Sequence, residues 1–185
     1  MKVLGIVGSP RKKGNTDILV QQVLDGAAEA GAETEKIYIN DMEFKGCQGC
    51  GFCKIQDYCK LEDDMTPVYD KIKETDGLVF GSPIYFAQFT GQMRLFLDRC
   101  YALSDADVVP RVEAGKKAVL VGSQGFDDDT AYKGVFDEFA DQLKTYVGIE
   151  VTDILIGADV NLSGDVRKNH ELMDQAKNAG LEMAK

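Results

Sequence analysis

The sequence has no tryptophan and a single histidine among its 185 residues. His170 falls near the apolar positions Val166 and Met173 of a C-terminal helical pattern, and no serine–histidine–aspartate set or carboxylate pair can be assembled around it. A lone histidine at such a place is more often a packing residue than an acid, a base or a metal ligand. We therefore predict no catalytic side chain.

Long hydrophobic runs are also absent, because no apolar stretch approaches the ~20 residues that a membrane-spanning helix needs. The apolar run at the N-terminus, within residues 1–8, is too short for a signal peptide and is typical of a strand. A chain of this length can bury roughly 70% of its unfolded surface, so it does not depend on disulfides. We expect a cytoplasmic protein with reduced thiols and no membrane partner.

Basic residues are in deficit, with 21 lysines and arginines against 31 acidic residues and a net charge of −10. This balance argues against nucleic acid as a partner. Against that background the basic run Arg11–Lys13 is an exception, and it follows directly after a buried apolar segment.

Short apolar runs that are typical of strands alternate with segments whose apolar residues recur at helical spacing. The expected strands lie near residues 3–7, 36–39, 78–80, 118–121 and 154–156. The helices are marked by Leu19, Val23 and Ala27; by Met65, Val68, Tyr69 and Ile72; by Met93, Phe96, Leu97 and Cys100; by Val135, Phe139, Leu143 and Tyr146; and by residues 165–183. The position of Cys100 on an apolar face predicts a core residue rather than a ligand.

This alternation predicts an α/β fold with a parallel sheet covered by helices on both faces. Five strands and five helices fit a flavodoxin-like doubly wound sheet of order 2-1-3-4-5. We expect one domain over residues 1–185, with a cysteine-rich insert at about 40–65. Ligands of such sheets bind beyond the carboxyl ends of the strands, where strands one and three part.

The loop after the first strand, Gly8-Ser-Pro-Arg-Lys-Lys-Gly-Asn-Thr16, leads into a helix N-terminus, where free N–H groups and the helix dipole favour an anion. Ser9, Asn15 and Thr16 add side-chain donors, and Arg11 adds charge. Asn15 or Thr16 is equally a good N-cap, which needs no ligand. The glycine–lysine–hydroxyl pattern of nucleotide P-loops and the dinucleotide Gly-x-Gly-x-x-Gly pattern are both missing. A phosphate monoester such as that of FMN suits the loop better than a magnesium nucleotide.

Two further loops follow strands at the same expected edge. After the third strand, Pro83 fixes the chain while Ile84, Tyr85 and Phe86 place apolar bulk beside a ligand. After the fourth strand, Gly125 permits close backbone approach, and Ser123 and Gln124 offer hydrogen bonds. Each loop alone could serve only for packing, but three such loops at one edge favour a flavin.

The segments "GSPRKKGNT", "DGLVFGSPIYF" and "MRLFLDRC" together resemble the NADPH-dependent FMN reductase group of flavodoxin-like proteins. With "CQGCGFCKIQDYC" after the second strand, the chain is similar to iron–sulfur flavoproteins. The resemblance implies that the phosphate of FMN binds to Ser9, Arg11, Asn15 and Thr16, and that its ring lies between Pro83–Phe86 and Ser123–Gly125. It also implies a [4Fe–4S] cluster on four cysteines and a homodimer or homotetramer.

The four clustered cysteines are Cys47, Cys50, Cys53 and Cys59, within thirteen residues. Two-residue spacings let successive thiolates converge on one small centre, and four cysteines are the usual ligands of a cluster. Zinc prefers two pairs separated by a longer insert, so three closely spaced cysteines favour a cluster over zinc. Free or redox-active thiols remain an alternative. Because the insert follows the strand beside strand one, we expect it at the same edge as the flavin.

The leading hypothesis is an FMN-dependent redox protein with a [4Fe–4S] cluster that transfers electrons between a donor such as ferredoxin and a small acceptor. The first alternative is an NAD(P)H-dependent FMN or quinone reductase whose cysteines are structural or vestigial. The second is a non-catalytic flavin-binding carrier or sensor.

Overall fold

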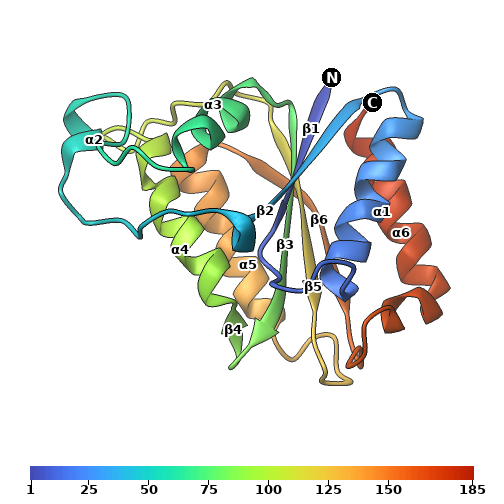
Figure 1. The fold of residues 1–185 in the computed structure, drawn as a ribbon. Coiled ribbons are helices and arrows are strands. Elements are labelled where there is room, and N and C mark those ends of the chain that lie inside the picture. The colour runs from blue at the N-terminus through green and yellow to red at the C-terminus, as the bar shows by residue number, and fades with distance from the viewer.

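The computed structural model describes residues 1–185 as one twisted sheet between two layers of helices (Figure 1). Five strands run parallel in the order β2-β1-β3-β5-β6, and a short strand, β4, pairs antiparallel with the end of β3. The strands are β1 (Lys2–Val7), β2 (Glu33–Tyr38), β3 (Gly77–Tyr85), β4 (Gln88–Phe89), β5 (Lys117–Ser123) and β6 (Glu150–Gly157). The α-helices are α1 (Asn15–Glu29), α2 (Phe52–Ile55), α3 (Thr66–Glu74), α4 (Gly91–Arg99), α5 (Lys133–Gln142) and α6 (His170–Met183).

The flavodoxin-like fold and the order of the parallel strands are confirmed, while the predicted count of five strands is one short. The missed strand is β4, whose two residues are too few to give an alternating pattern. Three 3₁₀ segments, η1 (Ile39–Asp41), η2 (Cys100–Leu103) and η4 (Asp165–Lys168), and one π-helical segment, η3 (Leu143–Val147), were not predicted. None of the helices is both long and apolar enough to cross a membrane.

Each face of the sheet has its own hydrophobic core. Helices α1 and α6 pack side by side on one face, and α3, α4 and α5 cover the other (Figure 1). The strands β1, β3 and β5 are buried over most of their length because both of their faces are covered, which explains their continuous apolar runs.

The contact between α1 and α6 is made by backbone against backbone. A Cβ at Gly180 would lie 1.9 Å from the carbonyl oxygen of Val23, and a Cβ at Gly26 would lie 2.0 Å from that of Lys177. Real atoms do not approach so closely, so glycine at these two positions sets the distance between the helices.

The carboxyl ends of β1 and β3 are tied to the start of α4. The N–H of Gly8 donates to the Gly81 carbonyl at 2.8 Å. Thr90 caps α4 by accepting from the Met93 N–H at 3.2 Å, and its hydroxyl donates to the Gly8 carbonyl at 2.7 Å. These bonds fix three segments at the edge of the sheet where the first predicted loop begins.

Candidate functional site

A cavity of about 210 Å³ opens at the carboxyl edge of the sheet. It is bounded by the loops that follow β1, β3, β5 and β6. Ten of the eleven predicted cofactor residues line it: Ser9, Arg11, Asn15, Thr16, Pro83, Ile84, Tyr85, Ser123, Gln124 and Gly125. The sequence therefore predicted a set of residues that the fold does bring together.

The loop after β1 keeps its shape through a bond within the loop and a bond to the first turn of α1. The Arg11 N–H donates to the Ser9 Oγ at 3.2 Å, and the Lys13 N–H donates to the Asp17 carboxylate at 2.7 Å. Lys13 has a φ of 60°, a left-handed conformation that a lysine adopts only when its surroundings impose it. The N–H groups of the first turn of a helix have no partner within it, and Gly14, the residue before α1, offers them no side-chain cap.

Asp17 is buried behind this loop rather than in the cavity. Its carboxylate accepts from the Lys36 Nζ at 2.6 Å and from the Tyr38 hydroxyl at 3.1 Å. Burial lowers the pKa of Lys36, but its bonds to Asp17 and Tyr38 outweigh that effect and raise the pKa overall. Lys36 thus neutralises an acidic side chain next to the loop that follows β1.

The side chain of Asn15 is fully engaged with the loop after β6. Its Nδ2 donates to the carbonyls of Val160 and Leu162 at 3.3 and 2.9 Å. Its Oδ1 accepts from the N–H groups of Gly164 and Val166 at 3.0 and 3.2 Å. Since all four side-chain bonds are used, Asn15 can offer a phosphate only its backbone N–H.

Two hydroxyls close the floor of the cavity. The Oγ1 of Thr16 and the Oγ of Ser123 lie 2.7 Å apart, and both residues are buried. Because either oxygen can donate to the other, one hydroxyl hydrogen remains free to donate to a ligand.

Gln124 supplies the clearest sign that the cavity is built for a ligand. Its Nε2 donates to the Asp128 carbonyl at 2.6 Å, while its buried Oε1 has no hydrogen-bond partner. It is the one buried side-chain oxygen or nitrogen in the protein without a partner. An unpaired buried acceptor is costly, so a ligand N–H at this place would satisfy it.

The charge of the lining also fits an anion. No aspartate or glutamate lines the cavity, although the whole chain carries a net charge of −10, and Arg11 faces it. The neighbouring Lys12 is paired with Asp41 at 2.6 Å, outside the lining. Within the basic run Arg11–Lys13, Arg11 is therefore the side chain that lines the cavity.

Phe86 is the predicted cofactor residue that does not line the cavity. It sits with Ala87 at the tip of the β3–β4 hairpin, where both have positive φ (49° and 61°), as a two-residue hairpin turn demands. Its side chain is fully exposed. Ile84 and Tyr85, the last two residues of β3, line the cavity, and Phe86 in the turn after them does not.

The four clustered cysteines lie in the insert, defined here as residues 46–62, which includes α2. Cys47 and Cys50 are exposed, Cys59 is half-buried and Cys53 packs into the core. The structure does not gather them, because no group of three or more histidine, cysteine, aspartate or glutamate side chains is placed to hold a metal ion. Gly49 and Gly51 have positive φ and open space around them.

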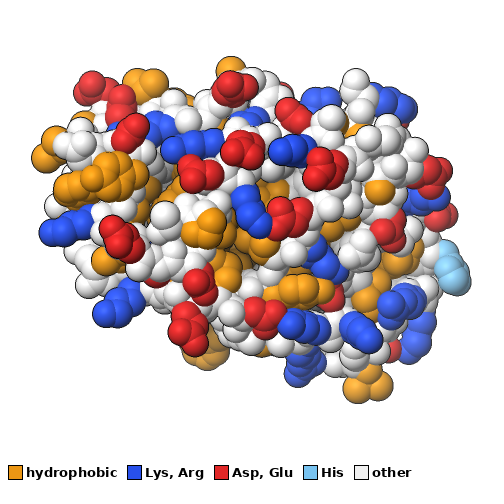
Figure 2. All heavy atoms as spheres, turned by 45° about the horizontal axis from the view of Figure 1, so that its top comes forward, with side chains coloured by type: hydrophobic (Ala, Val, Ile, Leu, Met, Phe, Trp, Pro, Cys, Tyr) orange, Lys and Arg blue, Asp and Glu red, His pale blue; other side chains and the backbone are white.

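The insert does not lie at the cavity edge, so that prediction is wrong. After β2 the chain forms η1 and then runs along α4 to the opposite end of the sheet, where α2 projects (Figure 1). Figure 2 shows apolar side chains on the left of the molecule, the side on which α2 lies in Figure 1. Ile55 and Tyr58 of the insert are exposed. The prediction fails because the segment before α2 is extended and carries the cysteines away from the carboxyl edge of the sheet.

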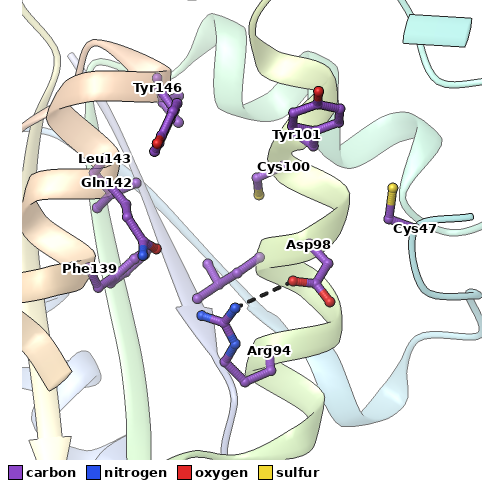
Figure 3. Close-up of a pocket in the computed structure, with 11 residues that line it drawn as sticks. Cys47, Arg94, Asp98, Cys100, Tyr101, Phe139, Gln142, Leu143 and Tyr146 are labelled. Carbon is purple, nitrogen blue, oxygen red and sulfur yellow. Dashed lines mark hydrogen bonds and ion pairs between the residues drawn. The ribbon is translucent and has the colours of Figure 1, made fainter. Parts of the chain in front are cut away.

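A groove of about 360 Å³ between α4 and α5–η3 lies beside the insert (Figure 3). Cys100, Tyr101, Leu143 and Tyr146 line it, and Cys47 reaches its edge. Burial raises the pKa of the Cys100 thiol to about 12, as suits the packing residue that the sequence predicted. His170 lies exposed at the start of α6.

The family model for NADPH-dependent FMN reductases matches residues 1–153. The chain belongs to this family. Together with the cavity, the match shows an FMN-dependent oxidoreductase with a flavodoxin-like fold.

Curated relatives narrow the group within the family. The chain is 34% identical over 186 residues to an iron–sulfur flavoprotein of Methanocaldococcus jannaschii, covering 100% of this chain and 96% of that protein. It is 31% identical over 137 residues to an iron–sulfur flavoprotein of Methanosarcina thermophila, covering 74% and 72%. The resemblance to iron–sulfur flavoproteins within the FMN reductase group is therefore confirmed.

Solved structures agree on the fold. An NAD(P)H:quinone oxidoreductase from Methanothermobacter marburgensis superimposes with a TM-score of 0.75 at 19% identity, covering 100% of this chain and 98% of that one. A flavone reductase gives a TM-score of 0.76 at 23% identity, and this chain spans 62% of its length.

In this member of the FMN reductase family, the loop after β6 is a part of the cavity that the sequence analysis missed. Val160, Asn161 and Ser163 line the cavity, and a Cβ at Gly125 would lie 2.4 Å from the Asn161 Oδ1. The segment 158–164, which contains Asn161, Ser163 and Gly164, follows the fifth parallel strand at the same edge. Ligands of such sheets bind beyond the carboxyl ends of the strands, so this loop could have been predicted in the same way as the other three.

Proposed function

We propose that this oxidoreductase carries FMN in the carboxyl-edge cavity and a [4Fe–4S] cluster on the cysteine insert. In this proposal it transfers electrons between a donor such as ferredoxin and a small acceptor in the cytoplasm. The family match supports the flavin, and the names of the relatives support the cluster.

The observation that carries the flavin assignment is the cavity itself, where loops from four parallel strands meet around a basic side chain and an unpaired buried acceptor. Arg11 and the first-turn N–H groups of α1 would bind the phosphate. Ile84 and Tyr85 would exclude water from one side of the ring, and Gln124 would accept a hydrogen bond from its polar rim. Bound FMN supplies the one- and two-electron chemistry, so no side chain need act as an acid or base.

The donor set of the insert fits an iron–sulfur cluster in kind. Four thiols within thirteen residues are the usual ligands, and Gly49 and Gly51 leave the backbone between them free to adjust. Cys47, Cys50, Cys53 and Cys59 would hold the cluster, which supplies single-electron transfer when bound.

The proposed cofactor sites lie at opposite ends of the sheet, as Figure 1 shows for the β3–β4 hairpin and α2. Electron transfer between them within one chain is therefore disfavoured. We infer that the working protein is a homodimer or homotetramer in which the insert of one protomer approaches the cavity of another.

Anaerobic purification tests the proposal. The expected result is one FMN per chain, about four irons and four sulfides per chain, and an electron paramagnetic resonance signal on reduction. Reduced ferredoxin should then reduce the protein faster than NAD(P)H does. Protein that holds FMN but no iron would overturn the cluster, and protein that neither retains nor rebinds FMN would overturn both assignments.

The separation of the four thiols favours a second candidate, an NAD(P)H-dependent FMN or quinone reductase with structural cysteines. Rapid NAD(P)H oxidation by iron-free protein would establish it. Bound flavin without turnover from either donor would indicate a carrier or sensor instead.

A further inference from the structure

The insert leaves and rejoins the body of the protein at one buried arginine. Arg99, the last residue of α4, is 1% exposed. Its NH1 and NH2 donate to the two carboxylate oxygens of Asp63 at 2.7 and 3.0 Å, and NH1 also donates to the Lys45 carbonyl at 2.6 Å. Lys45 stands two residues before Cys47 and Asp63 stands four residues after Cys59, so one guanidinium holds both ends of the insert.

Neighbouring bonds reinforce this junction. The Asp63 carboxylate also accepts from the Lys45 N–H at 3.3 Å and from the Met65 N–H at 3.1 Å. The Nε of Arg99 donates to the Tyr69 hydroxyl at 3.1 Å, and that hydroxyl donates to the Arg99 carbonyl at 3.2 Å. We call Arg99, Asp63, Tyr69 and the Lys45 backbone the Arg99 cluster.

The Arg99 cluster lies beside Cys59, one of the proposed iron ligands. Two other basic residues, Lys54 and Arg111, hold the middle of the insert. Cys59 and Tyr69 line the same cavity of about 190 Å³. The Lys54 Nζ donates to the carbonyls of Tyr101 and Ser104 at 2.8 and 2.7 Å, and Arg111 donates to the Cys53 carbonyl at 2.7 Å. The insert is therefore docked on η2 and closed at its base.

We propose that Arg99 and Asp63 are positioning residues that hold the two ends of the insert together and so limit how far the outer cysteines, Cys47 and Cys59, must move to meet at a bound group. This inference rests on the proposed [4Fe–4S] function. Fixing both ends of a loop reduces the conformations from which its ligands must converge, so the bound group is retained longer. A bidentate arginine–carboxylate pair suits this task because its planar geometry sets both distance and direction.

Two forms of the protein are needed to test this. In the FMN-bound, iron-free chain, hydrogen exchange of residues 46–62 reports whether the insert is closed, whatever metal it binds. In the anaerobically loaded chain, the rate of iron loss to a chelator reports whether closure retains the group. If even the wild-type chain takes up no iron, the proposed function fails, while hydrogen exchange still decides on the Arg99 cluster.

In Arg99→Met we expect exchange within 46–62 to accelerate about tenfold or more, and iron loss to accelerate similarly, because the carboxylate is left unpaired and the loop ends separate. The matched control is Arg94→Met on the same helix. Arg94 pairs with Asp98 on the exposed face at 3.4 Å, so insert exchange and iron loss should stay within about twofold of wild type.

The double variant Arg99→Met with Asp63→Asn shows whether the insert opens because Arg99 no longer holds it or because the whole protein is less stable. Removing both charges leaves no buried unpaired carboxylate, so the thermal midpoint should recover relative to Arg99→Met. The insert should nevertheless stay open, because methionine cannot donate to Lys45. Should Arg99→Met fail to fold, Arg99→Lys and Asp63→Asn give the same comparison with intermediate effects. Unchanged insert exchange in Arg99→Met, or exchange that recovers with stability in the double variant, would overturn the proposal.

Discussion

At the scale of single residues, adjacent side chains of one basic run have separate tasks. Arg11 lines the cavity, whereas Lys12 turns away to pair with Asp41 and to lie over the Tyr38 ring at 5.1 Å. The sequence alone does not show which of the three basic residues, Arg11, Lys12 or Lys13, would bind the phosphate. Their different surroundings make the assignment of the phosphate to Arg11 testable against its neighbour.

Arg11→Ala should raise the Kd for FMN about 10- to 100-fold, since a charge-assisted hydrogen bond contributes about 1.5–3 kcal/mol. Titration of apoprotein with FMN, followed by quenching of flavin fluorescence, measures the change. Lys12→Ala is the control and should change the Kd less than about threefold. An equal effect of the two substitutions would contradict the assignment.

The thiols should also differ from one another in reactivity. At pH 8 a thiol with a pKa near 12 is thiolate in on the order of one molecule in ten thousand, so Cys100 should react last with iodoacetamide. In iron-free protein, exposed Cys47 and Cys50 should react first. Mass spectrometry of peptides after timed labelling gives the order, and early labelling of Cys100 would show that the groove beside it opens.

At the scale of elements, backbone contacts rather than side chains decide how α1 and α6 meet. Gly26 and Gly180 face the backbone of the opposite helix, and no side chain intervenes. The glycines are visible in the sequence, but the approach of Gly26 to Lys177 and of Gly180 to Val23 joins the two ends of the chain and emerges only in the fold.

Gly180→Ala should lower the free energy of unfolding by about 1–3 kcal/mol, because the added methyl group forces the helices apart. Gly134→Ala in α5 is the matched control, since a Cβ there meets nothing within 4 Å. It should leave stability unchanged or raise it by up to about 1 kcal/mol. Urea unfolding of both variants makes the comparison, and equal effects would show that α1 and α6 can move apart freely.

The base of the insert should respond to acid. Burial alone would raise the pKa of Asp63, but Arg99 and the N–H groups of Lys45 and Met65 outweigh burial and lower it. The contribution of Asp63 to stability is therefore fully present above its unfolded pKa of about 3.9 and is lost as the pH falls through the lower folded value. The stability difference between wild type and Asp63→Asn should be constant above about pH 5 and shrink below about pH 4. Urea unfolding across that range checks this, and a difference that stays constant down to low pH would show that folding leaves the pKa of Asp63 unchanged.

At the scale of the whole molecule, the sheet separates two sites that the sequence placed together. The cavity lies beyond the carboxyl ends of the strands, and the insert lies at the far end of α4. Acidic and basic side chains are interspersed over most of the face shown in Figure 2, and several basic side chains gather at its lower right.

Because the sites are separate, loss of the insert thiols should leave FMN binding intact. A variant with Cys47, Cys50, Cys53 and Cys59 all replaced by serine should bind FMN with a Kd within about twofold of wild type. Fluorescence titration of the variant measures it. A tenfold weaker Kd would mean that the insert thiols themselves contribute to binding FMN.

The sequence by itself determined the order of strands and helices and ten of the cavity residues. Those predictions hold because apolar periodicity is local and because parallel strands all end at one edge. Only the tertiary structure decided the course of the insert, the full engagement of Asn15 and the exclusion of Phe86. These depend on contacts between distant residues, such as Arg99 with Lys45 and Asn15 with Val166, which no local pattern encodes.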